Sequence, residues 1–444
     1  MFEPSDSFNS TPVAPGPLPL GGRAVRFAGI LGLIVLLYLA TVPILDLVEE
    51  RRRTRDDVVR EVAGTWGGAQ VVGAPVVSLP LCTVDPRTGI LSDAGYYHVL
   101  PRELTVTGEV TPVLRYRTLY PVVLYSARLR LEGSFDLPGP DAPELVDYPV
   151  RRDQSVVSVG ISDLRGIRDG VRLLWNGKAL DLEPGRTAPN LFPAGISARG
   201  PAVAAADAGG RVRFSLELTV NGSEDIRFLP LGETTTVRLR SPWPDPGFGG
   251  AFLPDTRRIG PAGFEASWKV LKFNRNFPQH ALSAGTDFAK DLTRSAFGVR
   301  LVYPVDGYQK VTRSLKYAIL FIFLTFVAFF LAETRSPRRP TLVQYLLAGV
   351  ALVVFYTLLL SLSEVAGFDS AYGFASLGVL AQVGLFARGI FGSTGSAVAV
   401  GGVLAALYGV LYVILRLEDT ALLVGSLLLF VVTGVLMYFF RRTD

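Results

Sequence analysis

The chain has 444 residues and a formal charge of +5 at pH 7, from 44 Lys and Arg against 39 Asp and Glu. This modest excess forms no dense basic patch with interleaved aromatics, which argues against nucleic-acid binding. A single cysteine, Cys82, excludes an intramolecular disulfide, and we expect it to be a small buried apolar side chain. His98 and His280 stand far apart without a Cys partner, so we expect no zinc site and no cofactor.

Six apolar runs predict membrane spans. A hydrocarbon core of about 30 Å needs roughly 20 apolar residues at about 1.5 Å each. The runs are Phe27–Leu45, Tyr317–Ala332, Leu342–Leu362, Ala371–Ala387, Val398–Leu415 and Ala421–Phe440. About 270 polar residues rich in Pro and Gly separate the first run from the second. We therefore expect an α-helical transmembrane bundle of six spans that carries a large soluble domain.

The distribution of basic residues predicts the orientation. Short cytoplasmic loops collect Lys and Arg, whereas long translocated domains are nearly exempt from this bias. With the N-terminus inside, eight basic residues become cytoplasmic, and one, Arg416, falls in the short outer loops. The eight are Arg23, Arg26, Arg335, Arg338, Arg339, Arg388, Arg441 and Arg442. Two basic clusters favour the opposite orientation: Arg51–Arg53 with Arg55 after the first span, and Lys310, Arg313 and Lys316 before the second. We nevertheless expect both termini in the cytoplasm and the large domain outside it.

Four segments are expected along the chain. Residues 1–22, rich in Pro, Ser and Gly, form a disordered cytoplasmic tail, and 23–48 form a signal-anchor helix that is not cleaved. Residues 49–314 form the large domain, and 315–442 form a five-helix transmembrane domain.

The large domain begins with a predicted helix, Asp46–Trp66. Glu49–Arg53 and Asp56–Arg60 are pairs of opposite charge four residues apart, which stabilise a helix. This helix continues the first span out of the membrane.

The rest of the large domain is expected to be β-sheet. Arg211–Val220 and Arg128–Phe135 alternate apolar and polar residues, the pattern of strands with one buried face. Asn176-Gly177 and Asn221-Gly222 predict hairpin turns. Repeated strands and turns without helical periods indicate a mainly antiparallel, sandwich-like domain.

Few residues suggest chemistry. No Walker A loop, G-x-S-x-G elbow or dinucleotide fingerprint is present, and no nucleophile–base set can be assembled, so we do not expect an enzyme. Asp163-Leu164-Arg165-Gly166 could place an acid and a cation in one turn, which we interpret as a structural ion pair or Asx-turn. Gly401-Gly402, with Ala405, Ala406 and Gly409, offer a small-residue face for close helix packing.

Four polar residues near the spans form a candidate membrane site: Gln344, Glu364, Glu418 and Asp419. Carboxylates at membrane depth are costly and indicate function by default. The predicted topology puts these carboxylates at the outer boundary, where capping of a helix start is a competing explanation. Both interpretations stay open, and we favour capping.

Twelve ordered strings resemble the CreD family of bacterial inner-membrane proteins, over roughly residues 45 to 444. They are Trp66–Gln70, Gly73–Pro75, Arg115–Arg117, Asp163–Ile167, Ser241–Pro244, Gly250–Pro254, Gly263–Trp268, Val305–Tyr308, Lys316–Phe321, Gln344–Leu347, Leu360–Glu364 and Leu417–Leu423. The resemblance implies a periplasmic domain, a role in cell-envelope integrity and stress tolerance, and a gene associated with a two-component regulatory system. It carries over no catalytic residue. Thr420 departs from the family, where an aromatic is usual at this position.

Three functions follow as hypotheses. The first is a non-enzymatic envelope protein, surrounded by membrane lipids, whose β-rich domain contacts periplasmic or envelope proteins. The second is a transport-like or lipid-handling protein that uses the candidate membrane site at the periplasmic leaflet. The third, an enzyme acting on envelope glycan or lipid, has the least support.

Overall fold

The computed structural model describes residues 22–417 except 89, 140–141, 143–144, 147, 186–190, 200–209, 283–286, 304–306, 335 and 337–339, and beyond 417 only isolated positions between 423 and 437. The contacts divide the chain into two compact units. One, the β unit, lies within Thr54–Pro304, and the other, the membrane unit, joins residues up to Arg53 to those from Val305 onward. The expected boundaries were 49 and 314. The difference at the second boundary arises because helix α5, Gly307–Lys316, packs against membrane helices.

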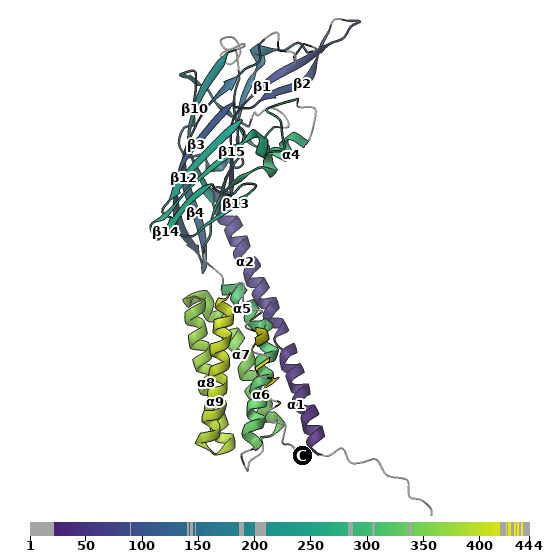
Figure 1. Cartoon of the computed structure of the whole chain (residues 1–444), viewed down its shortest axis with the longest axis vertical. Helices are drawn as coiled ribbons and strands as arrows, with labels where there is room; N and C mark the ends of the chain where they lie inside the picture. The colour runs from purple at the N-terminus through teal and green to yellow at the C-terminus, as the bar shows by residue number, and fades with distance from the viewer. Residues whose placement is uncertain are drawn as a thin grey trace, which may run out of the picture. The chain divides into compact units, whose positions relative to one another are not determined.

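The membrane unit is built from helices, most of them apolar (Figure 1). They are α1 (Gly22–Leu39), the start of α2 (Val42–Trp66), α5, α6 (Ala318–Thr334), α7 (Leu342–Ala366), α8 (Phe368–Phe391) and α9 (Thr394–Arg416). Within the described residues, four helices are long and apolar enough to span a membrane: Val25–Trp66, which joins α1 and α2, then α7, α8 and α9. The α5–α6 pair, bent by 51°, makes a fifth if it is one span. The expected sixth span, Ala421–Phe440, lies mostly outside the described residues.

The helix expected over Asp46–Trp66 is confirmed as part of α2. Glu49 and Arg53 pair as predicted, at 3.3 Å. Arg60 pairs with Asp57 rather than with Asp56, because residues three apart also face each other on a helix.

A close helix contact joins α1 and α7. A Cβ at Gly349 of α7 would lie 2.1 Å from Leu37 Cδ1 of α1, so this glycine lets the two helices approach. Among the described atoms, a Cβ at Gly401, Gly402 or Gly409 would meet nothing within 4 Å. The described helices therefore supply no partner for the small-residue face on α9, and the expected sixth span lies mostly outside the described residues, so this packing face stays a prediction.

The β unit consists of two sheets. Sheet A has the order β13-β17-β11-β1-β5-β9-β8, with β2 also paired to β1 and β16 paired to β2. Sheet B has the order β14-β15-β12-β3-β4-β10-β6-β7. All the recorded pairings are antiparallel except β1–β11 and β3–β12, so the mainly antiparallel prediction is confirmed.

The strands of each sheet have the following bounds. Sheet A contains β1 (Gln70–Val84), β2 (Leu91–Val99), β5 (Val156–Ile161), β8 (Glu183–Pro184), β9 (Gly195–Arg199), β11 (Asp225–Phe228), β13 (Pro246–Gly250), β16 (His280–Leu282) and β17 (Phe297–Leu301). Sheet B contains β3 (Glu103–Arg117), β4 (Tyr120–Asp136), β6 (Arg172–Trp175), β7 (Lys178–Leu180), β10 (Arg211–Ser223), β12 (Thr234–Ser241), β14 (Thr256–Gly260) and β15 (Gly263–Leu271). A short helix α4 (Asp287–Arg294) and the 3-10 turns η2 (Arg152–Gln154), η3 (Leu164–Gly166) and η4 (Lys272–Asn274) complete the described elements.

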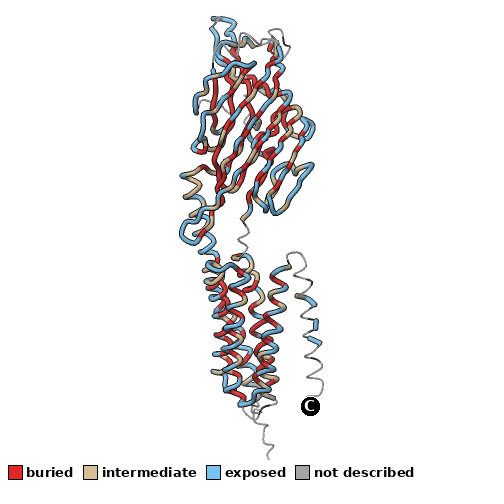
Figure 2. The backbone as a smooth tube through the Cα atoms, turned by 90° about the vertical axis from the view of Figure 1, so that its left-hand side faces the viewer, coloured by how far each residue is buried: buried red, intermediate tan, exposed pale blue. Residues whose placement is uncertain are grey.

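The core of the β unit is made by inward-facing residues of both sheets. Along β10, the apolar residues of the predicted alternation are buried and the arginines Arg211 and Arg213 are exposed. Figure 2 shows the same alternation of buried and exposed residues along the long strands. Trp268, Tyr125 and Phe135 are fully buried, and Cys82 is buried as expected. Since such burial stabilises a fold by about 25 cal/mol per Å² of apolar surface, the unit needs no disulfide.

One of the two predicted hairpins is confirmed. Asn176 (φ 46°) and Gly177 (φ 81°) form the two-residue turn between β6 and β7. Asn221-Gly222 is not a turn, because β10 continues through both residues and pairs with β4. A Cβ at Gly222 would lie 2.3 Å from the Tyr125 hydroxyl, so this glycine provides room for the tyrosine ring. Strand β10 ends at Ser223, and the chain turns at Glu224 (φ 57°) to enter sheet A as β11.

Candidate functional site

The structure separates two residues of the candidate membrane site. Gln344 lies in the first turn of α7, where its side-chain oxygen accepts a 2.8 Å hydrogen bond from the Thr341 N–H, and Thr341 in turn caps the helix. Glu364 lies at the other end of α7, roughly 30 Å away at the helical rise. Glu418 and Asp419 fall outside the described residues. Gln344 is thus a helix-capping residue, and the structure does not bring it near Glu364.

Glu364 ties three helices together at its end of the bundle. Its carboxylate accepts a 2.9 Å hydrogen bond from the Tyr308 hydroxyl of α5, and Arg51 Nε of α2 lies 4.0 Å away. Only 12% of the Glu364 side chain is exposed. The contacts satisfy the carboxylate within the protein, as a structural role requires.

Two further ion pairs of the membrane unit were not predicted. Asp369 at the start of α8 pairs with Arg416 at the end of α9, at 3.1 Å. At the opposite end of the bundle, Arg26 of α1 lies 2.8 Å from Glu333 of α6, which also accepts a hydrogen bond from the Tyr345 hydroxyl. Glu333 directly follows an apolar run, and this isolated acid was the available signal for the pair.

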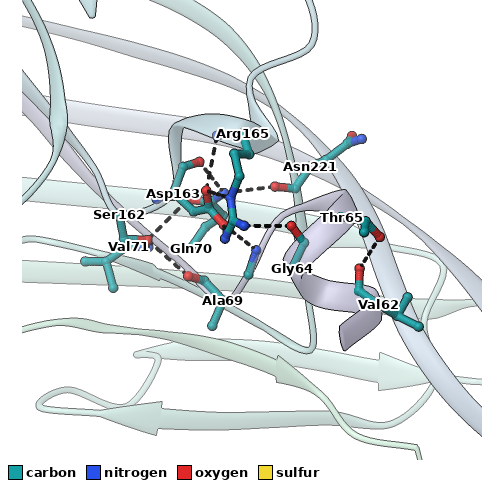
Figure 3. Close-up of polar contacts among 11 residues, drawn as sticks. Val62, Gly64, Thr65, Ala69, Gln70, Val71, Ser162, Asp163, Arg165 and Asn221 are labelled. Atoms are coloured by element: carbon teal, nitrogen blue, oxygen red, sulfur yellow. Dashed lines mark hydrogen bonds and ion pairs between the residues drawn. The ribbon is translucent and has the colours of Figure 1, made fainter. Parts of the chain in front are cut away.

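In the β unit, the end of helix α2 is bound to both sheets by a cluster we call the helix–sheet joint: Gly64, Gln70, Asp163, Arg165 and Asn221 (Figure 3). The Gln70 side chain of β1 donates 3.0 Å hydrogen bonds to the backbone carbonyls of Asp163 and Asn221. Arg165 donates a 2.7 Å bond to the carbonyl of Gly64, one of the unpaired carbonyls at the C-terminal end of α2. The joint therefore connects α2, sheet A and β10 of sheet B.

The Asp163–Arg165 turn predicted from the sequence supplies the charge of the joint. Asp163 accepts bonds from the Arg165 backbone and guanidinium, and another of 2.9 Å from the Gly68 N–H. The Arg165 guanidinium, with help from the Gly68 N–H, lowers the pKa of Asp163 to about 2. The interpretation as a structural ion pair within an Asx-turn is confirmed.

His98 and His280, which are far apart in the sequence, lie on neighbouring strands. His98 of β2 is adjacent to β16, which begins at His280. His98 is buried, its Nδ1 is 2.8 Å from Ser78 Oγ, and its ring stacks on Phe288. Burial lowers the pKa of His98 to about 4, so the imidazole is neutral at pH 7. In the part of the chain that the structure describes, no group of three or more His, Cys, Asp or Glu could hold a metal ion.

The solvent side of sheet B carries a charged surface. A recess of about 1000 Å³ there is lined by seven arginines and three glutamates. Six of these arginines lie on strands in two rows: Arg128, Arg130, Arg172, Arg238, Arg240 and Arg258. We call this surface the arginine face. No local sequence pattern indicates this face, because only strand pairing brings its residues together.

The bundle of apolar helices and the two-sheet unit define a multi-pass membrane protein with a large β domain. The pattern of the family described as "Inner membrane protein CreD" matches residues 23–444. Inner membrane protein CreD of Escherichia coli (strain K12) is 31% identical over 424 residues, which are 94% of this chain and 93% of that protein. The chain therefore belongs to the CreD family of inner membrane proteins, as the ordered strings indicated.

The likeness to a solved structure is weak. A two-domain M1 zinc metallopeptidase bound to L-arginine aligns with 38% of this chain and 39% of its own, at 13% identity and a TM-score of 0.17. So low a score does not indicate a shared fold, and nothing is carried over from that enzyme.

Proposed function

We propose that the protein contributes to cell-envelope integrity and stress tolerance as a non-enzymatic inner-membrane protein whose β domain is a periplasmic interaction module. Family membership supports the location in the inner membrane. The arginine face is the observation that carries the interaction role, because it is a broad charged recess. Such a surface suits binding better than covalent chemistry.

The orientation is part of the proposal. Arg26 and the end of α8 at Arg388 belong to one end of the membrane unit, and Glu364 and Asp369 belong to the other. The positive-inside rule then favours an N-terminus in the cytoplasm and a β domain in the periplasm.

Thiol labelling tests this orientation directly. In a Cys82→Ser background, Asp153→Cys places a single exposed thiol on the β domain, and Gly395→Cys places one at the start of α9. We expect a membrane-impermeant maleimide to label Asp153→Cys in spheroplasts, and Gly395→Cys only after lysis. The reverse pattern would contradict the proposed orientation.

Dye uptake under detergent stress tests the envelope role. A deletion strain should take up more dye than the wild type, and the wild-type gene on a plasmid should restore the barrier. Equal uptake with and without the gene would contradict the role.

The same assay separates the envelope proposal from a polar membrane site. The contacts of Glu364 with Tyr308 and Arg51 support a structural role for this carboxylate. We therefore expect the combined variant Glu364→Gln, Glu418→Gln and Asp419→Asn to restore the barrier when its membrane level matches the wild type. Failure at normal abundance would favour a lipid- or ion-handling site.

A further inference from the structure

The arginines of the arginine face form two rows that cross the strands of sheet B. In the first row, strand pairing aligns Arg238, Thr107, Arg130, Glu217 and Arg172. The second row, one pleat away, runs Arg258, Glu265, Arg240, Glu109, Arg128 and Thr219. Arginines thus recur on every second strand, about 10 Å apart, with the rows about 7 Å from each other. The spacing is set by the sheet and is therefore rigid.

Only part of this positive charge is neutralised within the face. Arg240 pairs with Glu109 at 3.1 Å, Arg258 with Glu265 at 3.6 Å, and Arg130 with Glu217 at 3.9 Å. Among the described residues, Arg128, Arg172 and Arg238 form no ion pair. These three exposed guanidinium groups, from β4, β6 and β12, lie along the rows. The face is therefore complementary to a ligand with repeated negative charges.

The chemistry between the arginines indicates the kind of polyanion. Thr107, Thr219 and Ser267 supply hydroxyls in the recess, and the glutamates supply acceptors for hydroxyl donors. Arginine binds carboxylate and phosphate groups bidentately. A polymer that carries both acidic groups and hydroxyls would satisfy both sets of partners.

Other polyanions fit the face less well. The lining contains no aromatic residue, whereas protein interfaces are enriched in aromatics at their centre and single-stranded nucleic acids stack on them. The surface is also recessed, with a volume of about 1000 Å³, so a flat bilayer would not reach its floor. An extended chain can lie in such a recess.

We propose that the arginine face binds a linear anionic polysaccharide or related polyol polymer that carries carboxylate or phosphate groups at intervals. This inference deepens the proposed interaction role of the β domain and rests on it. Arg128, Arg172 and Arg238, which pair with no described acid, hold the acidic groups, and the neighbouring hydroxyls and glutamates contact the sugar or polyol hydroxyls.

Binding to defined polymers by the full-length protein in detergent tests the inference. The probes are polygalacturonate for carboxylate, poly(glycerol phosphate) for phosphate, and dextran as the neutral polymer. Polyglutamate, a single-stranded oligonucleotide and phosphatidylglycerol vesicles represent the rival classes. We expect one or both of the first two to bind more tightly than every other probe, with an affinity that falls as salt increases.

A matched pair of variants locates the binding. The variant Arg128→Gln/Arg172→Gln/Arg238→Gln removes three charges from the face, and Arg87→Gln/Lys178→Gln/Arg199→Gln removes three exposed charges elsewhere on the β unit. We expect the first to weaken binding at least about tenfold and the second less than about twofold. Tryptophan fluorescence during heating verifies that both variants fold like the wild type.

Three results would overturn the inference: no binding of either anionic polymer, equal weakening by both variants, or tighter binding of polyglutamate, oligonucleotide or vesicles. Dye uptake decides the envelope role separately. If the wild type restores the barrier but binds neither polymer, the envelope role stands and the polysaccharide inference fails. If the polymers bind but the deletion leaves dye uptake unchanged, the proposed function fails.

Discussion

The Asp163 carboxylate lies 2.8 Å from the guanidinium of Arg165, and the same guanidinium donates to the carbonyl of Gly64 at the end of α2. The ion pair thus links the turn that follows β5 to the C-terminal end of α2. Helix α2 ends at Trp66, and strand β1 starts at Gln70. The Gly68 N–H also donates to Asp163. The Asp163–Arg165 pair therefore binds both the end of α2, at Gly64, and the segment that connects α2 to β1, at Gly68.

Asp163→Asn should destabilise the β unit by about 1 kcal/mol at pH 7. The carboxylate is 14% exposed but Arg165 is 64% exposed, so solvent screens the pair and limits its contribution. All four tryptophans, Trp66, Trp175, Trp243 and Trp268, lie in the β unit, and their fluorescence follows its unfolding in the full-length protein. The exposed Asp153→Asn is the control, and equal effects of the two substitutions would contradict the role of the joint.

Gly67→Ala should destabilise the β unit by about 2 kcal/mol. Gly67 has a φ of 138°, and an added Cβ would lie 2.7 Å from the Asn221 carbonyl oxygen. Gly64→Ala, three residues earlier and within α2, meets nothing within 4 Å and should be neutral or slightly stabilising. Tryptophan fluorescence compares the two, and a tolerated alanine at Gly67 would refute the close approach.

His98 should make the β unit less stable as the pH falls from about 6.5 to about 4. The folded pKa of His98 is about 4, below the ordinary value, so the unfolded state takes up the proton first and is favoured. The loss should reach about 3 kcal/mol at pH 4 and be absent above pH 7.

A histidine pair on adjacent strands provides the comparison. His98→Gln should flatten the pH dependence between 4 and 6.5, and His280→Gln, at an exposed position, should retain it. An unchanged slope in His98→Gln would show that another group controls this pH range. Stability is again measured by tryptophan fluorescence.

Gly349→Leu should destabilise the membrane unit by about 2 kcal/mol, since the added side chain collides with Leu37 of α1. Gly402→Leu, where an added Cβ meets no described atom within 4 Å, is the control. Ala375→Cys in a Cys82→Ser background puts a thiol in the buried core of this unit, and its rate of reaction reports opening. Similar rates in both leucine variants would contradict the close contact of α1 and α7.

Tyr308→Phe and Glu364→Gln should not be additive. The 2.9 Å hydrogen bond between the two side chains predicts a coupling free energy of about 1 kcal/mol. The Ala375→Cys reaction rate measures each single variant and the double variant. Strict additivity would mean that the bond contributes nothing to stability.

The sequence could not predict that two residues of the candidate membrane site lie far apart. Gln344 and Glu364 were both recognised as polar residues at the edge of one apolar run, and α7 confirms that run as a helix. Grouping them required knowing which end of the bundle each one occupies, and the length of α7 separates them. The ion pair of Arg26 with Glu333 was missed for the same reason, because the two residues are 307 positions apart in the chain.

The sequence by itself determined the apolar helices, the strand character of Arg211–Val220, the turn at Asn176-Gly177 and the family. Each of these depends on a local period or motif, which a short segment carries within itself. Only the tertiary structure decided that Gln70 binds the carbonyl of Asn221 and that Arg238, Arg130 and Arg172 stand in one row. Such contacts depend on the order and register of distant strands, which are set by packing of the whole core rather than by any one segment.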